Sequence, residues 1–313
     1  MKKDFMWAHL LQLGSNMWNE EGNTRGREHR SNSEASPVLR FDRRLWDEYV
    51  LELKQAGVNT LIIDIGEAMA YESHPELAVL GSWSRAQMCA EVERLKKLGF
   101  EVVPKLNFSA CHDAWLKDYS RMLSTPIYYT VCSDLIHEVC EVFKPKYFHI
   151  GMDEERIEYQ KQYDYAVCRQ FDLWWKDFYF LVNCVERENV RAWIWSDYIW
   201  SQPEEFLKKM PKSVLQSNWY YGNFEGEALQ RAEVRSFDLL EEHGYDQVPT
   251  GSVWSKRENF ELLTQYCSKH ISSERLYGLM QTTWERIADP WMQKHHAAAD
   301  SLASAKTWLN NQN

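Results

Sequence analysis

Short apolar runs alternate with longer amphipathic stretches along almost the whole chain of 313 residues. Eight of the short runs are rich in β-branched and aromatic residues and are bounded by polar residues or glycine, which is typical of buried strands. They lie at His9–Gly14, Asn59–Gly66, Glu101–Phe108, Tyr147–Asp153, Arg191–Asp197, Ser213–Tyr220, Gln247–Trp254 and Tyr277–Trp284.

Most of these runs are separated by stretches with apolar residues at helical spacing. We expect helices at Leu45–Ala56, Ser84–Leu98, Tyr128–Phe143, Tyr163–Arg187, Glu225–His243, Glu258–His270 and Trp291–Leu309. Ser84 is a typical helix cap, and Gly57, Gly99 and Gly244 are typical helix stops. Strand and helix alternating in this way predict an α/β fold, a single (β/α)8 TIM barrel over residues 1–313.

A long polar segment, Asn19–Pro37, follows the first predicted strand and is rich in Glu, Arg, Asn and Ser. It is either a surface excursion or a lid over the strand ends, since long loops of barrels take both roles. We find no Pro/Gly/Ser-rich linker and no repeat of fixed period, so the sequence favours one domain.

Composition excludes some classes of function. The formal net charge of −10 argues against a nucleic-acid partner, because phosphate binding requires a basic face. The seven cysteines show no CxxC spacing, which favours free thiols in a reducing compartment. We also expect no signal peptide, no membrane span, no cofactor and a cytoplasmic location. The sequence does not decide between a monomer and a homodimer.

The fourth predicted strand ends in a glycine followed by three consecutive carboxylates, Asp153, Glu154 and Glu155. Barrel enzymes carry their chemistry at the carboxyl ends of the strands. Alternation along the strand predicts that Asp153 faces the barrel interior together with His149, while Glu154 at the junction reaches over the mouth. Glu155 is expected to face solvent or cap the next helix. An alternative interpretation makes all three acids helix-capping and first-turn residues.

Polar residues and tryptophans also lie at the predicted carboxyl ends of most other strands. They are Asp64, Asn107 with His112 just beyond, Trp195 and Asp197, Trp219 and Tyr220, Trp254, and Trp284 and Glu285. Each of them alone is more commonly a core or capping residue, but together they indicate one site. Paired carboxylates in unequal environments cleave glycosidic bonds, and the 15 tryptophans offer flat apolar surfaces for sugar rings.

The run from His149 to Glu154, His-Ile-Gly-Met-Asp-Glu, resembles the His-x-Gly-Gly-Asp-Glu signature of glycoside hydrolase family 20, the β-N-acetylhexosaminidases. Further segments agree in order: Tyr71–Leu77 resembles the family's Tyr-Pro-Glu-Leu loop, Trp195–Asp197 its fifth-strand Trp-Asp, and Gly278–Glu285 its last strand. The resemblance extends over most of the chain at low identity.

The resemblance implies substrate-assisted, retaining hydrolysis of terminal β-linked N-acetylhexosamine, with an aminosugar glycoside as the substrate and no metal. Glu154 would protonate the leaving oxygen and later deprotonate water, and Asp153 would orient the acetamido group. The implied sugar-contacting or supporting residues are Asp64, His112, His149, Trp195, Asp197, Trp219, Tyr220, Trp254, Trp284 and Glu285.

The chain departs from the family pattern around the sugar. Leu13–Asn16 lacks the usual arginine, for which Arg25 or Arg27 could substitute. Strand 3 carries Lys105 and Asn107 in place of two acids. Gly251–Trp254 lacks the usual tyrosine, for which Tyr220 or Tyr221 could reach in. Met152 replaces the second glycine.

Three alternatives stay open at this stage. A two-carboxylate retaining glycosidase acting on another sugar would have to use Glu285 as its nucleophile. A non-catalytic glycan-binding barrel would fit the missing arginine and tyrosine. A metalloenzyme would rest on His295 and His296 or on the run Cys111-His112-Asp113.

Overall fold

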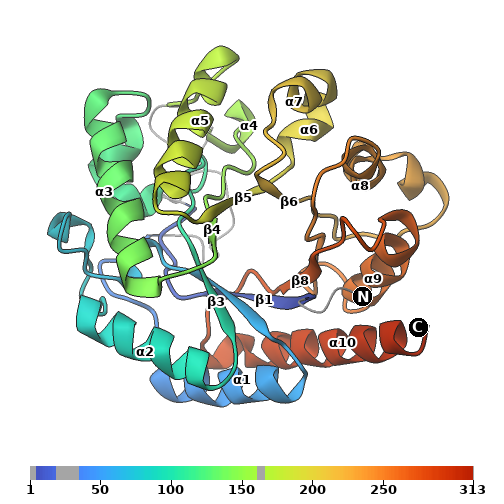
Figure 1. The fold of residues 1–313 in the computed structure, drawn as a ribbon. Coiled ribbons are helices and arrows are strands. Elements are labelled where there is room, and N and C mark those ends of the chain that lie inside the picture. The colour runs from blue at the N-terminus through green and yellow to red at the C-terminus, as the bar shows by residue number, and fades with distance from the viewer. Residues whose placement is uncertain (1–4, 19–34, 161–165, 313) are drawn as a thin grey trace.

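A computed structural model of the protein describes residues 5–18, 35–160 and 166–312. Its eight strands pair in parallel, in the order β6-β5-β4-β3-β2-β1-β8-β7. Isolated bridges between Gln216 and Gln247 and between Trp219 and Thr250 join the two outer strands and close the ring. Helices surround this ring (Figure 1). The predicted (β/α)8 barrel is therefore confirmed.

Seven of the strands are shorter than the apolar runs that predicted them, whereas β1 begins at Met6 instead of His9 and is one residue longer. The strands are β1 Met6–Gln12, β2 Thr60–Asp64, β3 Glu101–Lys105, β4 Tyr147–His149, β5 Arg191–Trp195, β6 Leu215–Ser217, β7 Thr250–Ser252 and β8 Gly278–Thr282. The difference lies mostly at the carboxyl ends. The acids after β4 and Trp254 after β7 therefore belong to loops instead of following the pleat, whereas Trp219 after β6 still bridges Thr250.

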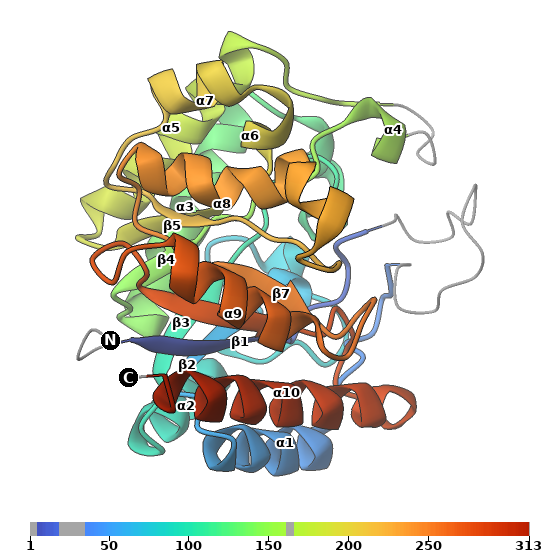
Figure 2. The same ribbon diagram turned by 90° about the vertical axis from the view of Figure 1, so that its right-hand side faces the viewer.

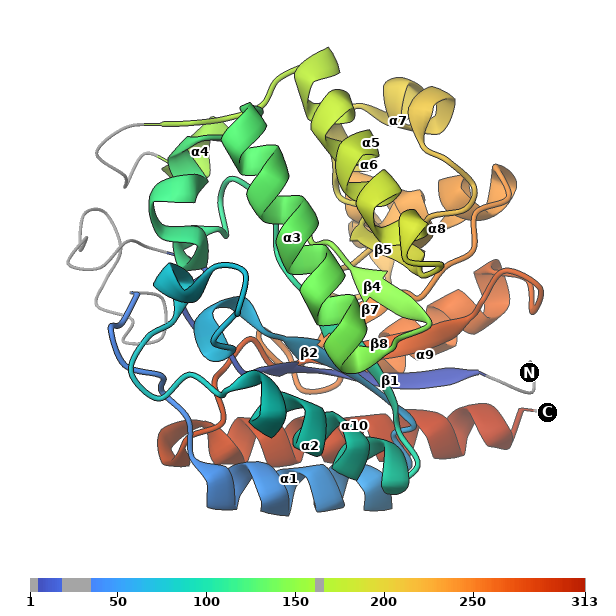
Figure 3. The same ribbon diagram turned by 60° about the vertical axis from the view of Figure 1, so that its left-hand side comes forward.

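Seven longer helices cover the barrel, as shown from two further sides in Figures 2 and 3. They are α1 Arg43–Gln55, α2 Arg85–Lys97, α3 Pro126–Phe143, α5 Asp172–Arg187, α8 Ala232–Glu242, α9 Asn259–His270 and α10 Met292–Asn310. The expected cap at Ser84 is present, and Ser84 forms a capping box with Gln87 at the start of α2. Short helices α4 Ile157–Gln160, α6 Tyr198–Ser201 and α7 Pro203–Lys209 lie in the loops after β4 and β5.

Two predicted helices begin later than expected. The helix predicted from Tyr163 begins at Asp172, because Phe171 has a positive φ of 53° that ends the preceding loop. The stretch predicted from Glu225 contains a short 3-10 turn at Gly226–Gln230, and α8 begins only at Ala232. In both places apolar residues at helical spacing continue into a loop, where Phe171 and Leu229 are exposed.

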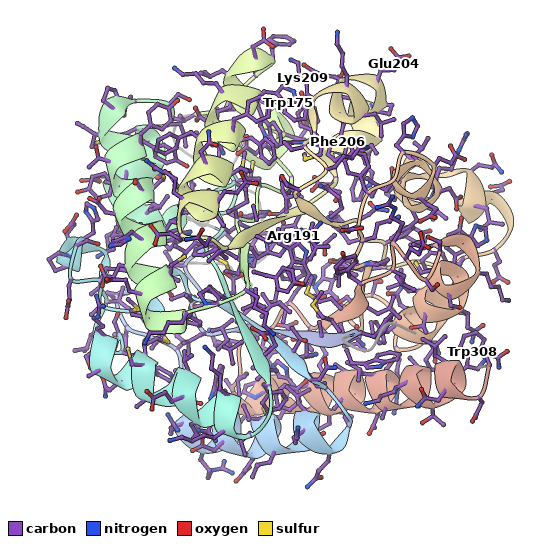
Figure 4. All side chains as sticks on the ribbon, viewed as in Figure 1. Trp175, Arg191, Glu204, Phe206, Lys209 and Trp308 are labelled. Atoms are coloured by element: carbon purple, nitrogen blue, oxygen red, sulfur yellow. The ribbon has the colours of Figure 1, made fainter. Side chains whose placement is uncertain are left out.

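An aromatic contact between α5 and α7 shows how the outer layer packs (Figure 4). The rings of Trp175 and Phe206 lie 6.4 Å apart, and the Lys209 ammonium lies 5.7 Å from the Trp175 ring. This contact fixes the short helices after β5 against the barrel.

The barrel interior has an apolar cluster and a polar layer. A separate apolar cluster fills the interior and reaches the carboxyl end of β5 at Trp195: Met6, Ala8, Leu10, Ile62, Val103, Trp193, Trp195, Leu215, Val248 and Met280. Beside it, Asp64, Lys105 and His149 are fully buried. Buried charged groups require partners, and groups in such environments cluster at functional sites. This polar layer is therefore the candidate position of the functional site.

Other expectations concern the thiols, the membrane and the loop after β1. All seven cysteines are free, and five of them are buried. Among the residues that the structure describes, no helix is long and apolar enough to cross a membrane. Most of the predicted loop Asn19–Pro37, with Arg25 and Arg27, lies outside the described residues.

Candidate active site

The loop after β4 carries the two acids in a left-handed turn. β4 ends at His149, and Gly151, Met152 and Glu154 have φ values of 72°, 70° and 56°. A Cβ on Gly151 would lie 2.1 Å from Asn107 Oδ1, so only glycine fits there. Asn107 Oδ1 also accepts the Met152 N–H at 3.1 Å. The turn, not strand alternation, therefore aims the acids.

Asp153 is buried as predicted, and two polar side chains hold it. Asn107 Nδ2 donates to Asp153 Oδ1 at 2.8 Å, and His112 Nε2 lies 3.5 Å from Asp153 Oδ2. The Ser109 hydroxyl donates to the Asp153 backbone carbonyl. Asp153 is thus fixed as a hydrogen-bond acceptor within the site.

Glu154 pairs with His112. His112 Nε2 lies 3.1 Å from Glu154 Oε2, and the Trp18 ring lies edge-on to the imidazole with centroids 4.1 Å apart. Burial alone lowers the pKa of His112, but Asp153 and Glu154 outweigh it and raise that pKa above its ordinary value. The two acids therefore favour the charged form of His112.

Asp197 supports the turn from the end of β5. Its Oδ2 accepts the backbone N–H of Glu154 at 2.9 Å. Burial, helped by the charge of Asp153, raises the pKa of Asp197 from 3.8 to about 7. Its Oδ1 has no hydrogen-bond partner in the part of the chain that the structure describes. Asp197 can therefore hold a proton near neutral pH beside the acid pair.

Glu155 does not face solvent or cap a helix, so that prediction is wrong. Its carboxylate forms a buried ion pair with Arg169, with Arg169 Nε 3.2 Å from Glu155 Oε2. Arg169 also donates to the Phe108 carbonyl at 2.6 Å and lies 3.3 Å from Asp177 on α5. Glu155 accepts the Ala110 N–H at 2.8 Å. This network ties the loop after β4 to the loop after β3 and to α5.

Aromatic rings from three strand ends stand beside the acids. The ring centroids of Trp195 and Trp284 lie 5.8 Å apart. The Trp284 indole N–H donates to the Tyr221 hydroxyl at 2.9 Å. Tyr221 stacks on Trp219 with ring centroids 5.0 Å apart. Burial raises the pKa of Tyr221 well above its ordinary value, and the charges of Glu154 and Asp153 raise it further. Tyr221 therefore remains a protonated hydroxyl close to the acid pair.

A buried ion pair lies on β2 and β3. The Lys105 ammonium is 2.5 Å from Asp64 Oδ2, and neither side chain is exposed. Burial raises the pKa of Asp64, although Lys105 opposes it. On the neighbouring strand β4, in register with Lys105, His149 Nδ1 accepts the Gly151 N–H at 3.0 Å, and the ring lies 4.6 Å from Trp195. Burial, together with Lys105, holds the pKa of His149 well below its ordinary value, so His149 is neutral.

Three other predicted sugar-contacting residues have described contacts away from the acids. Tyr220 contacts Phe224 in an edge-to-face arrangement and packs against the outer core. Glu285 pairs with Lys294 at 2.6 Å. Trp254 is 46% exposed after β7.

His112, Asp153 and Glu154 also form a group of donors whose spacing could hold a metal ion if His112 were neutral. One ligand atom from each lies within 4.8 Å of the others. The first metal site weighed from sequence, His295 with His296, does not form. His295 is buried with Nε2 3.1 Å from the Arg286 carbonyl, whereas exposed His296 pairs with Glu52, so the two rings do not converge.

Comparison with known proteins gives a match at the level of structure. No family model and no curated protein matches the chain. Among solved structures, the Flavobacterium johnsoniae chitobiase of family GH20 is similar with a TM-score of 0.61 and 18% identity, over 83% of this chain and 45% of that one. The Bacteroides fragilis β-N-acetylhexosaminidase is similar with a TM-score of 0.63 and 13% identity, over 99% of this chain and 71% of that one.

A third similar structure is the Streptomyces plicatus N-acetyl-β-hexosaminidase in complex with Thio-NAglucal, with a TM-score of 0.63 and 14% identity, over 95% of this chain and 63% of that one. The chain has the family 20 barrel fold. It spans between about half and about two thirds of most of these proteins' lengths, since the shares run from 45% to 71%.

Within this family 20 fold, sequence reasoning left three residues out of the predicted site. Tyr221 was considered beside Tyr220, but only the structure shows which of them turns toward the acids. From sequence, Asn107 was only a departure from the family pattern. Its hydrogen bond to Asp153 explains why an amide stands there. The Trp18 ring contacts His112 from the loop after β1. No motif marks Trp18, so spatial proximity is the only signal.

Proposed function

We propose that the protein is a glycoside hydrolase that removes terminal β-linked N-acetylhexosamine by substrate-assisted, retaining hydrolysis. The unequal environments of Asp153 and Glu154 support this most directly. Asp153 is held by the Asn107 amide, whereas Glu154, whose side chain is 19% exposed, faces His112 at the mouth. Adjacent carboxylates with different partners can divide the work of positioning and of proton transfer.

In the proposed first step, the acetamido oxygen of the substrate attacks the anomeric carbon as the glycosidic C–O bond breaks. Glu154 gives its proton to the leaving oxygen. Asp153 accepts a hydrogen bond from the acetamido N–H, which becomes more acidic as positive charge develops on that group. Asn107 occupies Asp153 Oδ1, so Oδ2 is the oxygen suited to this contact.

In the proposed second step, Glu154 removes a proton from water, and the water oxygen attacks the anomeric carbon. The bond to the acetamido oxygen breaks, and the sugar leaves with its original anomeric configuration. The imidazolium of His112 would stabilise the Glu154 carboxylate between the two steps, because the two groups are 3.1 Å apart.

The aromatic side chains have roles that fit this chemistry. The Tyr221 hydroxyl already accepts the Trp284 indole N–H, so its own proton remains available to the acetamido carbonyl oxygen. Trp195 and Trp284 would wall the pocket for the acetamido methyl and the apolar face of the sugar. A mutant of the similar Streptomyces plicatus β-hexosaminidase is known in complex with its product GlcNAc, which supports a carbohydrate substrate.

The test is a panel of para-nitrophenyl glycosides that differ in the acetamido group. Activity confined to the acetamido sugars is expected, whereas activity confined to plain hexosides would favour a two-carboxylate glycosidase. Glu154→Gln should lower kcat by about 100- to 10,000-fold on a substrate with a poor leaving group, since general acid catalysis contributes that much.

Glu158→Gln is the matched control, because Glu158 is exposed on α4. It should keep wild-type activity, and circular dichroism should show both variants folded. Near-normal turnover by folded Glu154→Gln would overturn the proposal. A wild-type protein that binds aminosugars but releases nothing from any aryl glycoside would instead be a glycan-binding barrel.

A further inference from the structure

A hollow lies between the end of β6, α6 and the start of α8. Its volume is about 640 Å³, which falls within the range of about 300–1,000 Å³ for ligand sites. Four aromatic residues line it: Trp200, Trp219, Tyr220 and Tyr221. Trp219 lies 4.4 Å from Trp200 and 5.0 Å from Tyr221, so the three form a continuous wall.

Two arginines line the same hollow, Arg156 and Arg231. The Arg156 guanidinium lies 6.0 Å from the Trp200 ring. Within residues 5–18, 35–160 and 166–312, neither guanidinium pairs with a carboxylate, although Glu233 also lines the hollow. In a chain of net charge −10, two arginines in one aromatic hollow with no carboxylate partner among the described residues favour an anionic ligand.

The start of α8 adds to the positive potential. Arg231 is the residue before this eleven-residue helix, and Ala232 and Glu233 form its first positions. The positive end of the helix dipole therefore faces the hollow together with the two guanidinium groups. The arginines carry full charges and the helix end a partial one, so the arginines contribute most of the positive potential.

The hollow adjoins the catalytic acids. Arg156 follows Glu154 by two residues, and its backbone N–H donates to the Glu154 carbonyl at 2.7 Å. The charge of Arg156 also partly offsets the burial that raises the pKa of Asp197. Tyr221 lines the hollow and stands beside the acid pair. A saccharide cleaved at Glu154 would thus extend its next sugar unit into this hollow.

We propose that this hollow binds an acidic sugar unit, bearing a carboxylate or a sulfate, next to the N-acetylhexosamine that is cleaved. The aromatic rings would cover the apolar face of the pyranose, and Arg156 and Arg231 would bind the anionic group through paired N–H donors. This inference rests on the proposed function and narrows its substrate class to acidic glycans.

The experiment compares three disaccharides that share a terminal β-linked N-acetylglucosamine. The second unit is glucuronic acid, sulfated galactose or neutral galactose. We measure kcat/KM for wild type, Arg156→Gln, Arg231→Gln and the control Arg44→Gln, whose charge change lies on α1 at an exposed position. The wild type should prefer at least one acidic disaccharide by about tenfold, the size expected for one hydrogen bond to a charged group.

Arg156→Gln and Arg231→Gln should each bring the ratio of acidic to neutral substrate toward one, while Arg44→Gln leaves it unchanged. Added salt should lower the ratio in the wild type, because partly exposed charges are screened. Preference for one acidic disaccharide over the other identifies the anion. Equal rates on acidic and neutral disaccharides, or a preference that survives both substitutions, would overturn the inference.

Binding separates this inference from the proposed function. If no disaccharide and no aryl glycoside is cleaved, the proposed function fails, and calorimetric titration with the glucuronate disaccharide and the sulfated disaccharide then tests the hollow alone. Binding of either to the wild type that is lost in both arginine variants supports the acidic-sugar site. No binding of either, or binding unaffected by both substitutions, overturns it.

Discussion

Lys105 and Asp64 form an ion pair inside the barrel in which neither side chain is exposed and the ammonium lies 2.5 Å from the carboxylate. The two residues are direct partners in the pairing of β2 with β3. The Lys105 charge also contributes to keeping His149 neutral and opposes the protonation of His112. The Lys105 charge therefore affects the protonation of Asp64, His149 and His112.

Replacing Lys105 by methionine should destabilise the protein by about 3–5 kcal/mol, because Asp64 is left as a buried charge without its cation. Urea denaturation followed by circular dichroism measures this loss. In the double variant Lys105→Met with Asp64→Leu, most of the lost stability should return, since two apolar side chains replace the pair. A double variant that is as unstable as the single one would show that the loss comes from packing.

Arg169 should act on catalysis from a distance, as a positioning residue. Arg169→Met leaves Glu155 and Asp177 buried without their shared cation, for an expected loss of about 3–5 kcal/mol. It also frees the loop that carries Glu154, so kcat should fall while the remaining structure stays folded. Urea denaturation and steady-state kinetics give the two readouts.

Arg257→Met is the matched control for Arg169→Met. Arg257 pairs with Asp300, and the two side chains are 67% and 68% exposed. Exposed pairs contribute about 0–1 kcal/mol, so this variant should keep both stability and activity. Equal effects of the two substitutions would show that the buried network does not hold the acid loop.

Asp197 should make stability depend on pH between about 4 and 7. Its pKa is raised from 3.8 to about 7 in the folded protein by burial and by Asp153. Below pH 4 both the folded and the unfolded state hold the proton. Between pH 4 and 7 only the unfolded state releases it, so rising pH lowers stability, and above pH 7 the loss is complete.

Asp197→Asn cannot ionise and should escape this loss. Its free energy of unfolding relative to wild type should therefore rise with pH through the same window, by on the order of 4 kcal/mol in total at 1.36 kcal/mol per pKa unit. Denaturant titrations at several pH values measure the difference. Asp300→Asn, at an exposed position, should show no such trend, and a flat profile for Asp197→Asn would contradict the assignment.

Tyr221→Phe removes one hydroxyl and keeps the ring. If that hydroxyl binds the acetamido carbonyl, kcat on para-nitrophenyl N-acetyl-β-glucosaminide should fall about 10- to 100-fold, since one donor to a reacting oxygen is lost. Tyr198→Phe is a suitable control, because the Tyr198 hydroxyl donates to Glu205 at 3.0 Å in the outer layer. Unchanged turnover in Tyr221→Phe would remove Tyr221 from the mechanism.

Periodicity was sufficient to predict the barrel, because each strand is an apolar run and each long helix an amphipathic one. It could not locate the ends of the strands. Beyond His149 the backbone turns left-handed, so the alternation that was applied to Asp153 no longer operates. Glu155 shows the same limit, because its partner Arg169 is brought near by a loop without a periodic pattern.

The residues around the acids also differ in whether a sequence pattern could predict them. Asp153 and Glu154 lie in the loop after β4 and His112 in the loop after β3, all within seven residues of a strand end, so a strand-end rule finds them. Tyr221 and Tyr220 are adjacent in sequence, and the choice between them depends on how the loop after β6 packs. Trp18 reaches His112 from a loop, which no local pattern predicts.

The close approach of Asn107 to Gly151 has a consequence for the evolution of this barrel. A side chain at position 151 would overlap the Asn107 side chain, which holds Asp153, and would also lie 2.8 Å from the Asn107 Cα, so a change at 107 alone would not make room for it. Met152, by contrast, already tolerates a side chain at a φ of 70°, although that side chain is buried. Relatives that keep this acid turn should therefore keep glycine at 151 and accept buried apolar side chains at 152.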